Sequence, residues 1–269
     1  MAAGDPEIAG LSGSIDELNC QTHHSISSIS VADPPQLSVV VPAYNESGRL
    51  PRTLSIIKPY LNANGLPWEL ILVNDGSTDS TLEVIRAEES LDPSHVRGVD
   101  LQPNGGKGPA VAAGVAESRG TLVLISDADF STPIDELPKL RQAIEAGHDI
   151  AIGSRAKRGA QVELSQPFHR VLMGKIFNLI VQVTVLPGFW DTQCGFKLWK
   201  GDVARETFNA MKLQGNVAFD VEVLYRARKR GYRIAEVPVR WYDSIPSRIS
   251  PLRHSAEALV DIAKIRFLR

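Results

Sequence analysis

The sequence predicts an α/β fold in which a mainly parallel, Rossmann-like sheet is flanked by helices. Short β-branched runs alternate with stretches of helical spacing as far as Arg158, which is the pattern of βαβ units. Most of these runs stop at a proline, a turn or an acidic residue. With 269 residues, of which 43% are hydrophobic and 22% charged, the chain is large enough to bury its own core.

Each expected element of this first part rests on a local pattern. Residues 37–41 are a β-branched run that ends at Pro42, which predicts a buried strand. Residues 49–61 carry leucine and isoleucine at helical spacing, which predicts a helix. Further strands are expected at residues 70–73, 96–101, 121–125 and 149–153, and further helices through Leu82 and Ile85, over 109–118 and over 134–146.

After Arg158 the alternation gives way to longer apolar segments. Residues 168–186 predict a helix, whose apolar face consists of Leu172, Ile176, Leu179, Ile180 and Val183. Further helices are expected at residues 219–229 and 256–268, and a strand at residues 234–241. The polar, serine-rich residues 1–35 predict a disordered leader before a domain that spans residues 36–269.

Composition and charge exclude several classes of protein. The formal net charge of −2 gives no basic excess for binding a nucleic acid. Cys20 and Cys194 lie far apart and match no metal spacing, so we expect reduced, structural thiols in a reducing compartment. A transmembrane helix needs about 20 apolar residues, and the closest segment, residues 171–186, is interrupted by three polar side chains.

Acidic side chains follow three of the expected strands. Glu46 and Asp75 come after the first two, and Asp127 and Asp129 come after residues 121–125. Since ligands of parallel sheets bind beyond the carboxyl ends of the strands, we expect these side chains at one edge. Two carboxylates one residue apart can bind Mg²⁺ or Mn²⁺ together with a diphosphate. The alternative is that they are solvated or cap helices.

Three further features can bind a nucleotide or a phosphate. Asp75 can accept a hydrogen bond from a nucleobase N–H, or it caps the next helix. Residues 104–108 form a glycine-rich loop in which Lys107 offers a charge to a phosphate, or they form a flexible turn. Arg155 and Arg170 have the planar guanidinium that binds phosphate through two hydrogen bonds, or they lie on the solvated surface.

Taken in order, the motifs resemble those of the family 2 glycosyltransferases, which have the GT-A fold. The motifs are Val41-Pro-Ala-Tyr-Asn-Glu46, Val73-Asn-Asp-Gly-Ser-Thr-Asp79, Gly106-Lys-Gly108, Asp127-Ala-Asp129 and Gly153-Ser-Arg155. Three later motifs look like the dolichyl-phosphate β-glucosyltransferase branch, close to the dolichyl-phosphate mannosyltransferases. They are Asp191-Thr-Gln-Cys-Gly-Phe-Lys197, Phe219-Asp-Val-Glu222 and Val237-Pro-Val-Arg-Trp241.

The resemblance implies a nucleotide-sugar half at residues 36–158 and an acceptor half at residues 159–269. In the first half it assigns the nucleoside to Pro42, Ala43, Tyr44, Glu46 and Asp75, with Lys107 in the loop beside the nucleotide. It assigns the ribose, the diphosphate and a metal ion to Asp127, Ala128 and Asp129. Ser131 stands where the mannosyltransferase relatives often carry a glutamine that binds the metal.

In the acceptor half, the resemblance implies phosphate contacts from Arg155 and Arg170. Lys197 of the 191–197 motif and Arg248 of the C-terminal loop complete the expected substrate-binding set. The implied reaction is an inverting transfer of a hexose, with glucose from UDP-glucose favoured, to a polyprenyl or dolichyl phosphate. The alternatives are a soluble enzyme that glycosylates a small phosphorylated or hydroxyl acceptor, and a non-catalytic nucleotide-sugar-binding protein.

The acceptor decides which residues are catalytic. An anionic lipid phosphate needs no general base, so the expected catalytic contribution is stabilisation of the leaving group by Asp129 and its neighbours. A hydroxyl acceptor needs a base, for which Asp191 and Asp220 are the candidates.

We expect a cytoplasmic protein that is peripheral on the cytoplasmic face of a membrane. Two segments carry apolar faces: residues 171–186 and the final helix with Lys264, Arg266 and Arg269. These faces either lie in the membrane interface or pack on the core.

Overall fold

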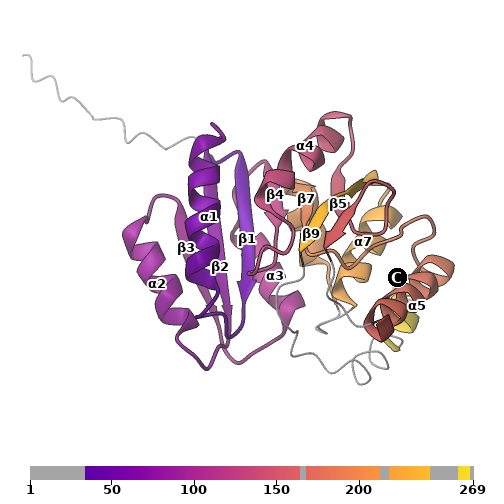
Figure 1. Cartoon of the computed structure of the whole chain (residues 1–269), viewed down its shortest axis with the longest axis horizontal. Helices are drawn as coiled ribbons and strands as arrows, with labels where there is room; N and C mark the ends of the chain where they lie inside the picture. The colour runs from indigo at the N-terminus through magenta and orange to yellow at the C-terminus, as the bar shows by residue number, and fades with distance from the viewer. Residues whose placement is uncertain (1–33, 164–167, 213–217, 243–259, 267–269) are drawn as a thin grey trace, which may run out of the picture. The chain divides into compact units, whose positions relative to one another are not determined.

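A computed structural model describes residues 34–163, 168–212, 218–242 and 260–266 (Figure 1). Residues 34–269 form one compact unit, distinct from residues 1–33. Nearly all of the predicted leader therefore lies outside the described residues.

A seven-stranded sheet forms the centre of the second unit, in the strand order β3-β2-β1-β4-β7-β5-β8. Its strands are β1 (Leu37–Ala43), β2 (Trp68–Asp75), β3 (Val96–Leu101), β4 (Leu122–Ile125), β5 (Ile150–Ser154), β7 (Lys197–Lys200) and β8 (Ile234–Pro238). All neighbouring strands are parallel except β7, which runs antiparallel to both β4 and β5. The mainly parallel sheet that the sequence predicts is confirmed, and the two predicted halves share it.

Helices cover both faces of the sheet (Figure 1). They are α1 (Leu50–Ala63), α2 (Thr81–Leu91), α3 (Lys107–Glu117), α4 (Leu137–Glu145), α5 (Phe168–Thr184), α6 (Gly201–Asn209) and α7 (Phe219–Lys229). A 3₁₀ turn (Ile134–Glu136) precedes α4, and residues 260–266 are also helical. Among the described residues, no helix is both long enough and apolar enough to cross a lipid bilayer.

The alternation of side chains along the strands builds one hydrophobic cluster on each face. Val39 and Val41 of β1 point into the cluster that α1 and α4 cover. Val40 points into the opposite cluster, to which α3, α6 and α7 contribute. Because most of the strands are covered on both faces, they are nearly continuous apolar runs, as the sequence shows for residues 70–73.

The second part of the chain departs from the prediction in two places. The strand expected at residues 234–241 is two strands, because Pro238 has no N–H to continue the ladder. The chain leaves the large sheet there, and β9 (Arg240–Tyr242) pairs with β6 (Gln161–Glu163) in a separate two-stranded sheet. In addition, β6, β7 and α6 were not predicted.

Candidate active site

The loops after β1 and β2 are bonded to each other at the carboxyl edge of the sheet. The Asn45 backbone N–H donates to Ser77 Oγ at 3.0 Å, and the Asn45 side-chain oxygen accepts from the Thr78 N–H at 2.8 Å. Asn45 has a φ of 56°, a left-handed conformation that asparagine tolerates better than most residues. The Glu46 N–H donates to Thr81 Oγ1 at 2.8 Å. The first expected nucleoside motif is therefore held on the start of α2.

Asp75 binds the glycine-rich loop that follows β3. Its carboxylate accepts from the Gly105 N–H at 2.8 Å and from Asn104 Nδ2 at 3.0 Å. Burial raises the pKa of the Asp75 carboxyl, although hydrogen bonds from Gly105 and Asn104 oppose this effect. At Gly76, where φ is 64°, a Cβ would overlap the Asn104 backbone. The loops after β1, β2 and β3 are thus connected by hydrogen bonds at this edge of the sheet.

The remaining nucleoside candidates differ in what they offer. Pro42 and Ala43 end β1, and Ala43 is buried. Tyr44 follows with its ring half-exposed, so it can stack on a ligand ring. The Glu46 carboxylate is already held by the Arg49 guanidinium through two hydrogen bonds of 2.6 Å.

Asp127 stands just beyond β4 and faces Lys107 at the start of α3. Asp127 Oδ1 and Lys107 Nζ are 2.5 Å apart. Burial disfavours the charge on each group, but their attraction prevails, so the pKa of Asp127 is lowered and that of Lys107 is raised. The ring of Phe219 lies 6.0 Å from the Lys107 ammonium. The sequence predicts both residues as ligand contacts, and the structure brings them together.

The loop that carries Asp127 and Asp129 is fixed from both sides. Thr53 Oγ1 of α1 donates to the Ala128 carbonyl at 2.8 Å. The Ser131 N–H donates to Asp129 Oδ1 at 3.0 Å, and the Ser131 carbonyl accepts from the Tyr242 N–H at 2.8 Å. The backbone of Ser131 thus joins the acidic loop to β9.

Gly195 lies against the Asp127 carboxylate. A Cβ built at Gly195 would overlap the Asp127 carboxylate carbon and both of its oxygens. The side chain of Asp127 therefore lies where it does because residue 195 is a glycine. Gly195 was not predicted as a site residue, and its position in the 191–197 motif was the only available signal.

Arg155 and Asp191 form a bidentate ion pair. Arg155 Nε lies 2.7 Å from Asp191 Oδ2, and Arg155 Nη2 lies 2.9 Å from Asp191 Oδ1. The backbone N–H groups of Arg155 and Gln193 donate to the same carboxylate, which is 1% exposed. Burial opposes ionisation, but Arg155 lowers the pKa of Asp191. A carboxylate with four donors and a lowered pKa is suited to holding Arg155, and poorly suited to accepting a proton.

Lys197 and Asp220 form a second, buried ion pair. Their Nζ and Oδ1 atoms are 2.5 Å apart, and Lys197 also donates to the Cys194 carbonyl at 2.6 Å. With 2% of Lys197 exposed, its role in this state is to hold the 191–197 loop on α7. Cys194 is buried and not in a disulfide, and burial raises the pKa of its thiol. These properties favour the structural role that the sequence predicts for Cys194.

Two residues that were not predicted from the sequence complete this region. The Glu236 carboxylate of β8 accepts from the Asp191 N–H at 2.8 Å and from the Trp190 N–H at 3.1 Å. The ring of Trp241 lies 5.4 Å from the Arg155 guanidinium carbon, a cation–π distance. A charged residue within an otherwise apolar strand was the only signal for Glu236.

Two predicted residues cannot be placed by their side chains. Arg170 lies in the first turn of α5, and only its backbone is described. Arg248 lies outside the described residues.

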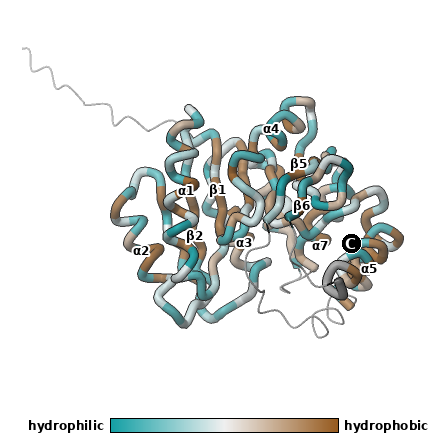
Figure 2. Tube along the Cα trace, viewed as in Figure 1, coloured by the Kyte–Doolittle hydropathy of each residue, from teal (hydrophilic) through white to brown (hydrophobic). Residues whose placement is uncertain are grey.

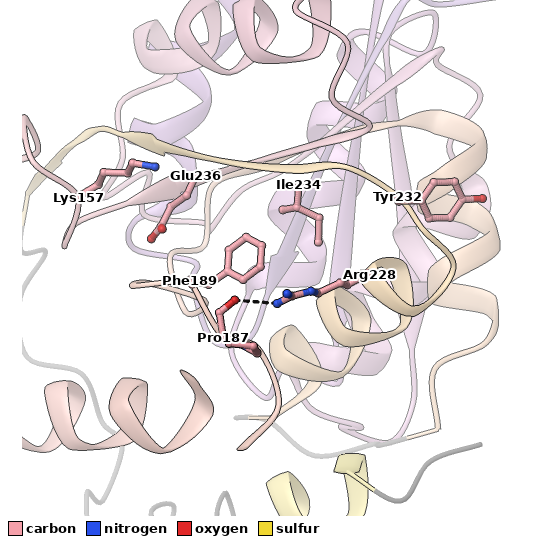
Figure 3. A pocket seen from close by; sticks show the side chains of 8 residues that line it. Lys157, Pro187, Phe189, Arg228, Tyr232, Ile234 and Glu236 are labelled. Atoms are coloured by element: carbon pink, nitrogen blue, oxygen red, sulfur yellow. Dashed lines mark hydrogen bonds between the residues drawn. The ribbon is translucent and has the colours of Figure 1, made fainter. Parts of the chain in front are cut away.

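A separate pocket of about 330 Å³ adjoins this region (Figure 3). It is lined by Lys157, Pro187, Gly188, Phe189, Arg228, Tyr232, Ile234 and Glu236. Arg228 Nη1 donates to the Pro187 carbonyl at 2.7 Å on one side of it. None of the predicted site residues lines this pocket, and it touches the site only through Glu236.

The sheet and its acidic edge define a class, the glycosyltransferases of the GT-A fold. Residues 38–208 match the sequence model of the family described as glycosyl transferase family 2. The chain belongs to glycosyltransferase family 2, and the family resemblance seen in the sequence is confirmed.

Relatives cover most of the chain. It is 36% identical over 242 residues to the dolichyl-phosphate beta-glucosyltransferase of Dictyostelium discoideum, covering 86% of this chain and 74% of that one. It is 35% identical over 236 residues to the human enzyme of the same name, covering 82% and 72%. The enzyme of that name from Saccharomyces cerevisiae is 31% identical over 247 residues, covering 86% and 74%.

Solved structures share the fold at lower identity. Glucosyl-3-phosphoglycerate synthase from Mycobacterium tuberculosis, solved with Mn²⁺, UDP and phosphoglyceric acid, matches with a TM-score of 0.63 at 20% identity, covering 87% of this chain and 80% of that one. A mannosyltransferase from Pyrobaculum calidifontis, solved with GDP-Man and Mn²⁺, matches with a TM-score of 0.59 at 20% identity, covering 88% and 66%.

Proposed function

We propose that this chain is an inverting glucosyltransferase that transfers glucose from UDP-glucose to dolichyl or polyprenyl phosphate. The observation that carries the proposal is 31–38% identity, over most of the chain, to enzymes named dolichyl-phosphate beta-glucosyltransferases. The charges near Asp127 support it, because Lys107 and Arg155 both act on this carboxylate and can serve as partners for two phosphate groups.

The donor nucleotide binds at the edge formed by the loops after β1, β2 and β3. Tyr44 offers an exposed ring to the base, and Asp75 fixes the loop whose glycines approach the phosphates. The Asp75 carboxylate, which would bind the donor base or ribose, is thus already held in place by the backbone N–H of Gly105. The names of the relatives specify glucose as the sugar that those enzymes transfer, and UDP-glucose is the donor proposed here.

The residues present fit a divalent cation, Mg²⁺ or Mn²⁺. Asp127 and Asp129 offer carboxylate oxygens, which both ions prefer. Within the described part of the chain, no three acidic, histidine or cysteine side chains are grouped as metal ligands. Two protein carboxylates are nevertheless typical of a site where substrate phosphates and water supply the other ligands. The cation would neutralise charge on the diphosphate as it leaves, and Ser131 contributes through its backbone bond to Asp129.

The acceptor phosphate binds at Arg155, whereas the diphosphate of the donor binds at Lys107. The ion pair with Asp191 and the ring of Trp241 hold the guanidinium in one orientation, which lowers the entropic cost of binding. The phosphate oxygen is anionic near neutral pH, so it attacks the anomeric carbon opposite the nucleotide without a general base. Lys107 stabilises the leaving diphosphate as the sugar acquires oxocarbenium character, and Asp127 and Asp129 would hold the cation that neutralises the rest of its charge.

We also propose that the protein is peripheral on the cytoplasmic face of a membrane, because the proposed acceptor is a lipid.

The test is transfer from UDP-glucose to a short-chain, water-soluble prenyl phosphate by the purified full chain, with Mn²⁺ or Mg²⁺. The expected product is a β-linked prenyl phosphoglucose, with little product from GDP-mannose. A small phosphorylated acceptor and a simple alcohol serve as the control acceptors. Turnover of either control acceptor at a higher kcat/KM than the prenyl phosphate would overturn the proposed acceptor. If no acceptor led to release of UDP, the proposal that the chain is an enzyme would be overturned.

A further inference from the structure

The outer face of α5 is apolar and exposed. Leu172, Ile176, Leu179 and Val183 recur at helical spacing, and their exposed fractions lie between 46% and 77%. At 1.5 Å per residue this row extends about 16 Å along the helix. The sequence places these four residues and Ile180 on the apolar face of a helix; Ile180 packs against the core, whereas the other four are exposed. Figure 2 shows the hydrophobic positions along α5.

The opposite face of α5 fixes the helix to the domain. Val181 is fully buried, and Phe177 and Ile180 pack against the same hydrophobic cluster. Ile262 and Ile265 of the C-terminal helical segment belong to that cluster as well, and Figure 1 shows this segment near α5. The exposed row therefore sits on a helix that is already anchored.

The charges on these two helices are predominantly positive. α5 has no acidic residue among its 17 residues, and Lys175 is exposed on it. Arg266 on the C-terminal segment is exposed too. An apolar row beside exposed cations is the surface that an anionic lipid bilayer attracts.

We infer that the outer face of α5 docks on an anionic lipid bilayer. The inference rests on the proposed function, since a lipid acceptor obliges the enzyme to work at a bilayer surface. α5 lies in the chain between β6, which pairs with the strand that carries Trp241, and the 191–197 loop that holds Arg155. Docking α5 would therefore place on the bilayer the helix that leads into the 191–197 loop.

A second copy of the chain fits this face less well. A symmetric dimer would bring each Lys175 and Arg266 toward the same cations of its partner. A stable interface also buries about 800 Å² on each partner, which is large for a row of four aliphatic side chains.

The test is sedimentation of the full chain with vesicles of phosphatidylcholine, with and without phosphatidylserine. The double variant Leu179→Glu/Val183→Glu should lower the partition coefficient at least ~10-fold. Lys175→Glu should weaken binding to the anionic vesicles alone. Leu91→Glu is the matched control, because Leu91 on α2 is as exposed as Val183, and it should bind as the wild type does.

Thermal unfolding and glucosyl transfer to a short-chain, water-soluble prenyl phosphate show whether the double variant is folded. Unchanged vesicle binding by the folded double variant overturns the inference. The inference is also overturned if the wild type does not bind vesicles and sedimentation velocity shows a dimer that these substitutions dissociate. Transfer without vesicle binding contradicts docking alone, whereas vesicle binding without transfer contradicts the proposed function alone.

Discussion

Gly195 shows how one missing side chain determines the position of a charged group. Its Cα hydrogen faces the Asp127 carboxylate, where any Cβ would overlap it. Adding a methyl group must move Asp127 away from Lys107, from the proposed cation, or from both.

We therefore predict that Gly195→Ala weakens binding of Mn²⁺ with UDP by ~10- to 100-fold, the range seen when support of a metal ligand is lost. Isothermal titration of Mn²⁺ in the presence of UDP measures the effect. Gly174→Ala on α5 is the control, because a Cβ there meets nothing within 4 Å. Wild-type affinity in Gly195→Ala would show that Asp127 does not need this position to hold the cation.

A substitution of Asp191 distinguishes two roles for its carboxylate: a general base that accepts a proton, and a partner that holds Arg155. Since four donors surround Asp191, we predict that Asp191→Asn raises the KM for the prenyl phosphate by at least ~10-fold while kcat changes less. Steady-state kinetics across pH measure it, and the profile should keep its shape. A general base would make kcat rise with pH as its carboxylate loses a proton. Loss of that rise in Asp191→Asn, together with a ~100-fold lower kcat, would instead identify Asp191 as a general base. Arg155→Lys should raise the same KM, because lysine lacks the bidentate geometry.

Among the elements, β7 depends most on distant residues. It has only four residues and begins at Lys197, whose ammonium is buried against Asp220 of α7. A lysine-bounded tetrapeptide carries no local signal for a central strand, because the partner that makes its burial tolerable lies 23 residues away.

We predict that Lys197→Met destabilises the fold by about 3 kcal/mol, because it leaves the Asp220 charge buried without its partner. Adding Asp220→Leu should recover at least half of that loss, since an apolar pair of similar volume replaces the ions. Urea unfolding followed by circular dichroism measures both free energies. If the two losses simply added, the ion pair would not couple β7 to α7.

The contrast between local sequence patterns and distant partners explains which parts of the fold and the site the sequence could predict. β1, β2 and the helix between them, α1, have strong local periods, so they were found with their ends shifted by a few residues. The acidic edge followed from them, because the carboxyl ends of parallel strands coincide. The pairing of Arg155 with Asp191 and of Glu236 with the Trp190 backbone spans tens of residues. Such partners depend on how the sheet is assembled, which no local pattern contains.

At the scale of the whole molecule, the carboxylates of the site link its stability to pH. The pKa values of Asp127 and Asp191 are both lowered by nearby cations. Their contribution to stability is complete above the unfolded pKa of ~3.9 and is lost as pH falls through the lower folded values.

We predict that the free energy of unfolding of the wild type falls more steeply below about pH 4 than that of Asp191→Asn. The difference between the two proteins should therefore be largest near neutral pH and shrink in acid. Urea unfolding at a series of pH values measures it, with Glu83→Gln, an exposed substitution on α2, as the control. Parallel curves for wild type and Asp191→Asn would contradict the link.

The reversed direction of β7 has a consequence for how acceptor specificity can change. Because β7 runs against β4, its first residue, Lys197, is paired with Ile125, the last residue of β4. The segment that enters β7 therefore arrives at the same edge that the other strands leave. We expect that residues 187–194 can be exchanged for those of a relative while Gly195 is kept, so that Asp127 and the strands of the proposed donor edge keep their positions. Under the proposed function, this inverted strand would let acceptor specificity change in the segment before β7 without a new nucleotide site.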